Sequence, residues 1–299
     1  MTAGSTGIMH QGLRHILSST PVLCDGAWGT ELQAVGLGAG ECPDSWNLFH
    51  PEHVKRLAAR YVEAGSRIIL TNTFRANRIA LQSYGLADQT TIINRAGVIL
   101  SRAATQNLAT VFASMGPTGK LLMAGDVTED EVRLAFTEQA ETLASAGASG
   151  IVLETFSDVA ELTIALSAAR ATGLPVVASM VYDSGKERDR TMMGTTPEEA
   201  ARAIEQAGAD VIGANCGTGI EAYIPVCTRL RRATALPVWI KPNAGLPEMT
   251  GDRIVYRQTP EEFARHALAL RDAGASFIGG CCGTTPEFIR ELHAVLADD

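Results

Sequence analysis

The stretch DAGASFIGGCCGTTP, residues 272–286, contains the features that decide the fold. Gly274 follows a helical pattern, an apolar run comes next, and the quartet GGCC (279–282) leads into a segment opened by Pro286. Glycine just after a helix and proline in a first helical turn are common boundary residues. The stretch therefore predicts the end of a helix, a strand, a sharp turn and a new helix in direct succession.

The same helix-to-strand signature occurs at three earlier glycines, Gly65, Gly147 and Gly208. Successive glycines of the set lie 61 to 82 residues apart, which is about twice the length of one βα unit in a barrel of ~250 residues. Further short apolar runs lie between them, as buried parallel strands require. Eight predicted strands result: 22–24, 68–70, 111–114, 151–153, 175–179, 211–213, 237–240 and 277–278.

We therefore predict an α/β fold with a single (β/α)8 TIM barrel over residues 21–299, preceded by a flexible N-terminal extension, residues 1–20. An open, doubly wound sheet is the alternative, and it explains the count of eight less well. Helices that open with proline are predicted at 51–64, 197–207 and 260–273. Long loops follow the odd-numbered strands, on the face where barrel enzymes place their active sites; they cover residues 26–50, 116–129, 182–196 and 244–259.

Composition and charge limit the partners of the protein. The net charge of −8 argues against nucleic acid, because phosphate binding needs clustered lysine and arginine. No apolar run reaches the ~18 residues that span a bilayer, and residues 1–20 contain no long apolar segment of a signal peptide. Six cysteines in such a chain predict reduced thiols rather than a disulfide framework. We expect a cytoplasmic protein without a membrane partner.

Three cysteines stand at predicted strand ends, Cys216 after the sixth strand and Cys281 and Cys282 after the eighth. Because these strand ends open on one face of a barrel, the three sulfurs are expected to meet there. Adjacent cysteines are badly placed to form a disulfide with each other, so the group predicts a soft metal such as zinc. The alternative is that these cysteines are small buried hydrophobes, which is our interpretation of Cys24 and Cys227. Cys42 stays unassigned.

Three thiolates with one open position are typical of a catalytic rather than a structural zinc site. Such a centre carries a net charge of −1 and would be a poor Lewis acid. It suits the deprotonation of a substrate thiol that keeps its high electron density. The reaction class that this predicts is alkyl transfer to sulfur.

Several motifs, in order along the chain, resemble the zinc barrel of the homocysteine S-methyltransferase family. The match covers residues 21–295, and TNTFRANR (71–78) is most similar to the homocysteine-binding module of cobalamin-dependent methionine synthase, although Arg75 stands where that branch usually has glycine. No equivalent of the aromatic residues of the betaine-dependent branch is found near Cys42 or Arg75. The motifs are DGAWGT (25–30), TNTF (71–74), GPTG (116–119), ETF (154–156), PNAG (242–245) and GGCCGTTP (279–286).

The resemblance implies a set of site residues. Cys216, Cys281 and Cys282 would be the zinc ligands, with Asn243 as a fourth ligand that homocysteine displaces. Asp25 and Glu154 would bind the substrate ammonium group, backbone N–H groups around Gly26 would bind its carboxylate, and Asn72 would line the mouth. The alternative for the two carboxylates is to cap loops by hydrogen bonding. Lys241 and Glu31 are interpreted as structural charges.

The implied activity is zinc-dependent methylation of homocysteine to methionine. Since the chain ends at Asp299 without room for folate-binding, cobalamin-binding and activation domains, we expect methylcobalamin in trans, on a separate corrinoid-binding protein. S-methylmethionine or betaine as direct donors are the alternatives within the enzyme class. Two further alternatives are not methyltransferases: a non-catalytic zinc- or thiol-binding subunit, and a phosphate-ligand enzyme that uses Gly279 and Gly280.

Overall fold

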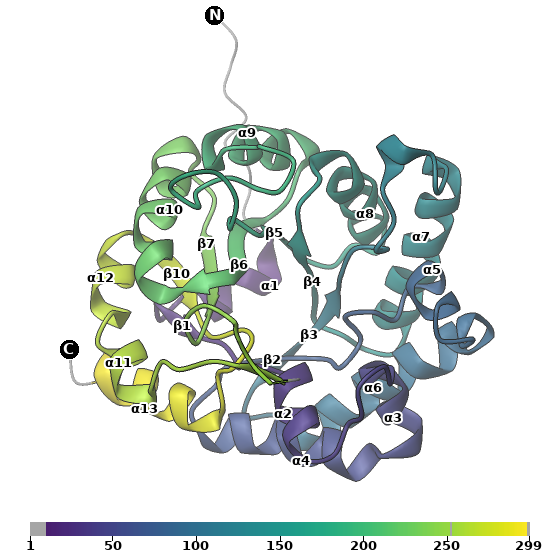
Figure 1. Cartoon of the computed structure of the whole chain (residues 1–299), viewed down its shortest axis with the longest axis horizontal. Coiled ribbons are helices and arrows are strands. Elements are labelled where there is room, and N and C mark those ends of the chain that lie inside the picture. Colours follow the sequence, from purple (N-terminus) through teal and green to yellow (C-terminus); the bar gives the residue numbers. More distant parts are fainter. Residues whose placement is uncertain (1–9, 252, 298–299) are drawn as a thin grey trace, which may run out of the picture.

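Eight parallel strands form a barrel surrounded by helices in the computed structural model, which describes residues 10–251 and 253–297 (Figure 1). A parallel bridge between Cys24 and Ile68 joins the first and last strands of the series, which runs β1-β10-β7-β6-β5-β4-β3-β2. The predicted (β/α)8 barrel is therefore confirmed. The barrel strands are β1 (Val22–Leu23), β2 (Ile68–Leu70), β3 (Thr110–Met115), β4 (Gly150–Phe156), β5 (Val176–Met180), β6 (Val211–Gly219), β7 (Val238–Asn243) and β10 (Ala275–Ile278).

Strand residues alternate between two cores, as the pleat of a β-strand requires. Inside the barrel, Trp239 packs against Phe277 with ring centroids 5.3 Å apart. Leu23 and Ile69 point outward instead and pack under the helices. On β4 and β7 the same alternation continues past the apolar layer. Glu154 and Lys241 each come two residues after an inward-pointing side chain, so they also point inward, toward the C-terminal ends of the strands.

The helices cover the outer face of the barrel, and three of them begin with a capping box that satisfies their first N–H groups: α7, α9 and α11. Short helices in the segments after β1 and β2 are α2 (Gly29–Ala34), α3 (Trp46–Phe49) and α5 (Arg78–Gln82). The α-helices that surround the barrel are α4 (Pro51–Glu63), α6 (Thr90–Thr105), α7 (Glu129–Ser145), α8 (Val159–Ala171), α9 (Pro197–Ala207), α10 (Ile220–Ala233), α11 (Pro260–Ala264), α12 (Ala267–Asp272) and α13 (Pro286–Ala297). Short 3₁₀ turns lie at Pro43–Ser45, Ala87–Gln89 and Leu122–Ala124.

One helix predicted as continuous, residues 260–273, is divided into α11 and α12. At the break the N–H of His266 bonds the carbonyl of Phe263, three residues back, which is tighter than the α-helical pattern. The His266 ring also contacts Glu221 at 2.9 Å. The apolar spacing continues across the break, so the sequence pattern did not reveal it.

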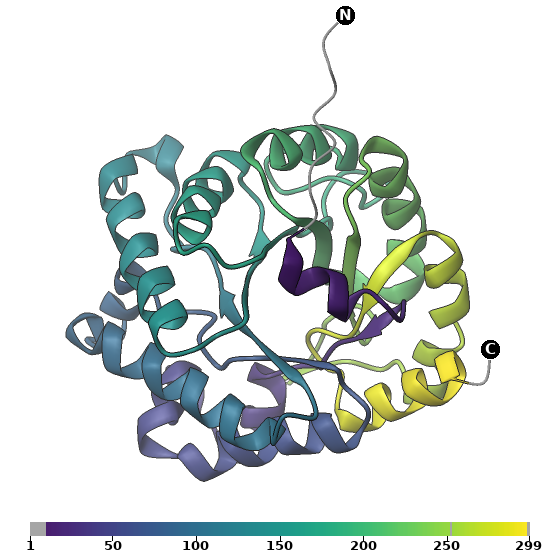
Figure 2. The ribbon, with the colours of Figure 1, turned by 180° about the vertical axis from the view of Figure 1, so that it is seen from behind.

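A short helix, α1 (Gln11–Ile16), lies across the end of the barrel where the strands begin (Figure 2). Its Leu13 is fully buried and packs with the inward side chains of the strands, including Val22 and Phe277. The sequence predicted a flexible extension over residues 1–20. Residues 10–20 instead contain this helix and its connection to β1, and residues 1–9 lie outside the described residues.

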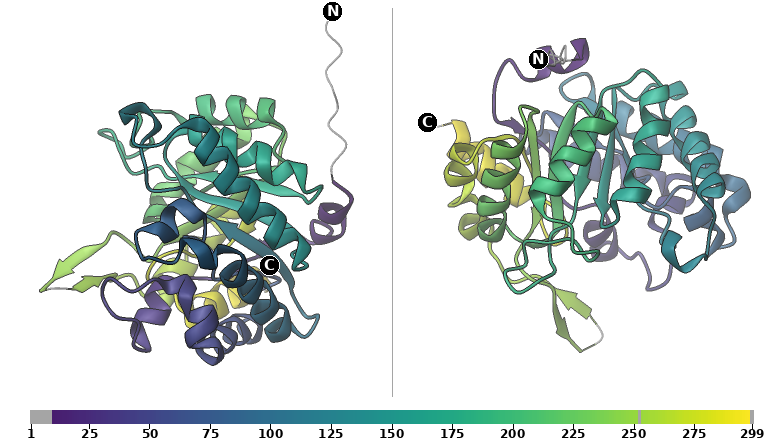
Figure 3. Two further views of the ribbon diagram at one scale, coloured as in Figure 1. Left: turned by 90° about the vertical axis from the view of Figure 1, so that its right-hand side faces the viewer. Right: turned by 90° about the horizontal axis from the view of Figure 1, so that it is seen from above.

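The opposite face of the barrel is formed by the long loops that follow the strands. One of them contains an antiparallel hairpin of β8 (Glu248–Thr250) and β9 (Arg253–Val255), which projects away from α1 (Figure 3). Among the described residues, none of the helices combines the length and apolarity that a bilayer span needs. The strand ends on this face carry the predicted site residues.

Candidate active site

Cys216, Cys281 and Cys282 converge at the ends of β6 and β10. Their Sγ atoms all lie within 4.8 Å of one another, and those of Cys216 and Cys282 are 4.0 Å apart. Thiolates bonded at ~2.3 Å to one tetrahedral cation lie ~3.8 Å from each other, so the observed spacing suits a shared metal after a small contraction. The predicted meeting of the three sulfurs is confirmed.

The backbone of the GGCC quartet is fixed between β1 and β7. The N–H of Gly280 bonds the carbonyl of Asp25 at 3.0 Å, and the N–H of Cys281 bonds that of Pro242 at 2.7 Å. The carbonyl of Cys282 accepts from the N–H of Ala244 at 2.9 Å. These bonds hold both adjacent thiols at the mouth of the barrel before any ligand is bound.

The same bonds contradict the phosphate-ligand alternative. That interpretation required free N–H groups at Gly279 and Gly280. Both are used within the barrel, by the carbonyls of Ile240 and Asp25 respectively. Side chains at either glycine would also collide with their neighbours, since an added Cβ would lie 2.7 Å from the Asp25 carbonyl or 2.2 Å from Thr284 Oγ1. The glycines serve close packing.

Cys216 reaches the cluster from an unusual backbone conformation. Its φ of 64° is in the left-handed region, which non-glycine residues rarely adopt. The pairing of β6 with β7 shifts register between Cys216 and Gly219, so the strand bulges at the cysteine. Such strain is often kept at functional sites, and here it directs one thiol toward the two from β10.

The side chain of Asn243 has one partner on its nitrogen and none on its oxygen. Nδ2 donates to the carbonyl of Gly217 at 3.2 Å, whereas the buried Oδ1 accepts no hydrogen bond from the described residues. An unsatisfied buried carbonyl oxygen costs about 1–3 kcal/mol. Asn243 ends β7 directly after Pro242, whose carbonyl accepts from the N–H of Cys281. The three thiols fit a zinc ion, and a cation bound there could supply the partner that this oxygen lacks. The amide as fourth ligand stays a prediction.

Within the cluster the three thiols compete for negative charge. Hydrogen bonds from Cys216 and Cys281 lower the pKa of the Cys282 thiol. The hydrogen bonds that Cys216 makes with Cys281 and Cys282, together with its burial, raise the pKa of the Cys216 thiol well above its usual range. One thiolate is thus favoured by the protein alone. Three thiolates together require a cation to compensate their charge.

A cavity of about 590 Å³ opens above the cluster. Its wall includes the three cysteines, Glu154 and Lys241. Four aromatic side chains also line it: Trp28, Phe74, Tyr84 and Tyr256. The volume is sufficient for an amino acid thiol with room above it.

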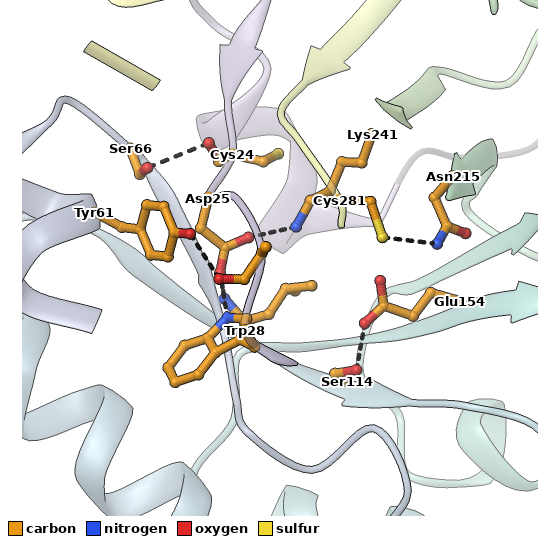
Figure 4. A network of polar contacts seen from close by, with 12 residues as sticks. Cys24, Asp25, Trp28, Tyr61, Ser66, Ser114, Glu154, Asn215, Lys241 and Cys281 are labelled. Atoms are coloured by element: carbon orange, nitrogen blue, oxygen red, sulfur yellow. Dashed lines mark hydrogen bonds and ion pairs between the residues drawn. The ribbon is translucent and has the colours of Figure 1, made fainter. Parts of the chain in front are cut away.

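Glu154, at the end of β4, is held by polar neighbours. It accepts a short hydrogen bond from Ser114, and burial raises its pKa to about 7, although the charge of Lys241 opposes that shift. Nearby, Asn215 accepts from the N–H of Thr155 at 2.9 Å and donates toward Cys281 Sγ at 3.9 Å. Asn215 thus links Thr155, the chain neighbour of Glu154, to Cys281; Figure 4 shows the Ser114–Glu154 and Asn215–Cys281 contacts as two separate pairs.

Asp25 lies beneath the wall of the cavity rather than in it. Its side chain is fully buried and forms an ion pair with Lys241, whose side chain reaches it from β7 (Figure 4). The second carboxylate oxygen accepts from Trp28 Nε1 at 2.9 Å and from the N–H of Leu70 at 2.7 Å. The structural interpretation of Lys241 agrees with this pairing. Binding of an ammonium group by Asp25 stays a prediction.

Gly26 and Asn72 both line the cavity. Asn72 donates to the carbonyl of Pro43 at 2.8 Å and to Asn47 Oδ1 at 3.1 Å, so its amide nitrogen holds a loop of the rim. Beside Gly26, the N–H of Ala27 already bonds the carbonyl of Thr284 at 3.0 Å. Substrate binding by Gly26 and Asn72 remains a prediction.

Replacing Gly26 with alanine is expected to destabilise the barrel by about 1–3 kcal/mol, because an added Cβ would lie 2.8 Å from the Tyr61 hydroxyl and 2.9 Å from the Thr284 carbonyl. The control is Gly29→Ala, where no atom lies within 4 Å and the expected change is within about 0.5 kcal/mol. Urea denaturation of both variants measures the difference. Equal midpoints would contradict the packing argument.

Some residues at the site were not singled out as ligand-binding by the sequence analysis. Lys241 has the inward strand phase of Trp239, two residues earlier, and this alternation could have placed it in the cavity. Asn215 could have been noticed as the neighbour of Cys216. Tyr256, whose hydroxyl hydrogen-bonds to Cys282, comes from the loop after β9 and had no sequence signal.

Comparisons with known proteins agree with this geometry. A family model described as homocysteine S-methyltransferase matches residues 22–296. Methionine synthase of Mycobacterium tuberculosis is 33% identical over the whole chain, and that of Mycobacterium leprae is 32% identical over 99% of it. The chain spans 26% of the length of each of these curated relatives.

A solved structure shares the fold. The metallated form of the homocysteine methyltransferase MmuM from Escherichia coli superimposes with a TM-score of 0.80 and 24% identity, covering 95% of this chain and 99% of that one. At this level of identity the likeness supports the barrel architecture alone.

Proposed function

Because this chain belongs to the homocysteine S-methyltransferase family, we propose that it transfers a methyl group to the sulfur of homocysteine and so forms methionine. The observation that carries the proposal is the convergence of three thiols, with Sγ atoms within 4.8 Å of one another, at the wall of a cavity of about 590 Å³. Thiolate clusters of this kind suit the activation of a further thiol.

The proposed cofactor is one zinc ion held by Cys216, Cys281 and Cys282, with the Asn243 amide oxygen as the fourth, exchangeable ligand. When bound, it would lower the pKa of the acceptor thiol so that the thiolate is available at neutral pH. Support comes from the unpartnered buried Oδ1 of Asn243. A reducing compartment such as the cytoplasm belongs to the proposal, because thiols this close would otherwise oxidise.

The protein residues around the cluster would orient the acceptor. In the proposed arrangement, Glu154 faces the ammonium group and backbone N–H groups around Gly26 face the carboxylate. Asn72 holds the rim in place. Asp25 could contribute to ammonium binding only after its bond to Lys241 is broken, since both carboxylate oxygens are already occupied.

A separate methyl-corrinoid protein is the proposed donor, so methylcobalamin would act in trans. A corrin ring needs a partner that docks over the mouth, and the hairpin offers exposed apolar side chains there, Met249 and Ile254. Ile254 also lines the cavity. Betaine and S-methylmethionine are the alternatives. The four aromatic side chains of the wall would suit such cations, but the guanidinium of Arg75, bonded to the Tyr84 hydroxyl at 3.0 Å, opposes them.

A donor screen tests the proposal. Zinc-loaded protein and homocysteine are offered methylcobalamin, S-methylmethionine or betaine separately, and methionine is measured. Methionine from methylcobalamin is the expected result. Methionine from betaine or S-methylmethionine alone would contradict the corrinoid donor, and zinc and thiol binding without turnover of any donor would favour a non-catalytic thiol-binding subunit.

A further inference from the structure

A lysine stands between the cavity and the buried carboxylate of Asp25. Lys241 is on β7, with its Nζ 5.8 Å from the centroid of the Trp239 ring, and only 2% of its side chain is exposed. Among the described residues, Lys241 lines the cavity, whereas its ion-pair partner Asp25 does not. A ligand in the cavity therefore meets the ammonium group first.

The carboxylate of Asp25 has no spare capacity for a ligand. One oxygen accepts from Lys241, and the other accepts from the Trp28 indole and the Leu70 N–H. A substrate ammonium group would have to displace Lys241 from a buried charge pair. Asp25 would gain a new partner, but the buried ammonium group of Lys241 would lose its own, which is strongly unfavourable.

Lys241 also changes the charge that Glu154 presents. The two side chains are close enough for the lysine charge to act on the carboxyl group, and Figure 4 shows Glu154 near Lys241 and Cys281. Two carboxylates alone would attract an ammonium ion. With Lys241 between them, an incoming cation meets a like charge in a water-poor site, where repulsion is weakly screened.

We propose that Lys241 determines acceptor specificity: it takes the position against Asp25 that a substrate ammonium group would occupy, and its charge offsets that of Glu154, the one carboxylate left to face such a group. The pocket therefore accepts thiols with a carboxylate but no ammonium group nearly as readily as homocysteine. This inference rests on the proposed function, because it places the acceptor thiol at the cysteine cluster. The chemical class is that of mercapto carboxylates. The representative is 4-mercaptobutyrate, which is homocysteine without its amino group.

Calorimetric titration of the zinc-loaded full chain with L-homocysteine and with 4-mercaptobutyrate tests the inference through binding alone. In a site that holds the ammonium by a charge-assisted bond, loss of that group would weaken binding about tenfold or more. We expect the two dissociation constants to agree within about fivefold instead. A homocysteine preference above fivefold would overturn the inference, and failure of both thiols to bind would overturn the proposed function with it.

Two variants separate the role of Lys241 from that of its surroundings. Lys241→Met frees Asp25 for a ligand, so homocysteine should become favoured by about tenfold or more. The double variant Asp25→Asn with Lys241→Met removes the freed carboxylate and should return the ratio to that of the unmodified protein. An unchanged ratio in Lys241→Met would contradict the inference. If that variant does not fold, the ratio measured on the unmodified chain decides alone.

Discussion

Replacing Cys216 with alanine is expected to abolish stoichiometric zinc binding and homocysteine methylation together. Zinc sites contribute about 10–16 kcal/mol in total, so loss of one of four ligands should weaken binding by roughly 100- to 1000-fold. Metal analysis after dialysis against a chelator measures the effect, with one zinc per chain expected for the unmodified protein. Methionine formation measures the accompanying loss of activity.

The matched control is Cys227→Ala, which removes a thiol from the apolar side of α10, away from the cluster. This variant should keep its zinc and its activity, with only a modest loss of stability from the smaller side chain. Retention of tightly bound zinc by Cys216→Ala, or equal loss from both variants, would show that the three sulfurs are not the metal ligands.

Replacing Asp25 with asparagine is expected to destabilise the metal-free protein by about 3–5 kcal/mol, because it leaves the ammonium group of Lys241 buried without its partner. Both side chains are almost fully buried, so water cannot compensate the charge. Urea denaturation in the presence of a chelator, followed by circular dichroism, gives the shift in midpoint.

The double variant Asp25→Asn with Lys241→Met provides the control. Because it removes both charges, it should recover much of the stability that the single variant loses. If Asp25→Asn unfolds at the same urea concentration as the unmodified protein, the ion pair is not a buried structural element. The proposal for Lys241 would then lose its structural basis.

The cluster of three thiols could be predicted because barrel topology fixes where each strand ends. Cys216 and Cys281 end strands two βα units apart, and carboxyl ends of barrel strands always share one face. The glycines beside them indicated sharp bends. The eight apolar runs were likewise recognisable, since strands buried on both faces need such residues.

Other features depend on contacts between distant segments and had no local signal. Leu13 sits in a polar tail, and only the barrel interior that it covers makes α1 stable. The pairing of Asp25 with Lys241 joins residues 216 positions apart. The unpartnered oxygen of Asn243 is likewise visible only when every neighbouring donor is known.

The sequence by itself determined the barrel, the face on which the site lies and the three thiols, because strand periodicity and strand-end position follow from local order along the chain. Tertiary structure alone decided which charges those strand ends present to a ligand. The reason is that electrostatic interactions depend on distance and burial in space. Asp25 carries a charge that the sequence shows, but Lys241 covers it, so the cavity wall presents an ammonium group in place of a carboxylate.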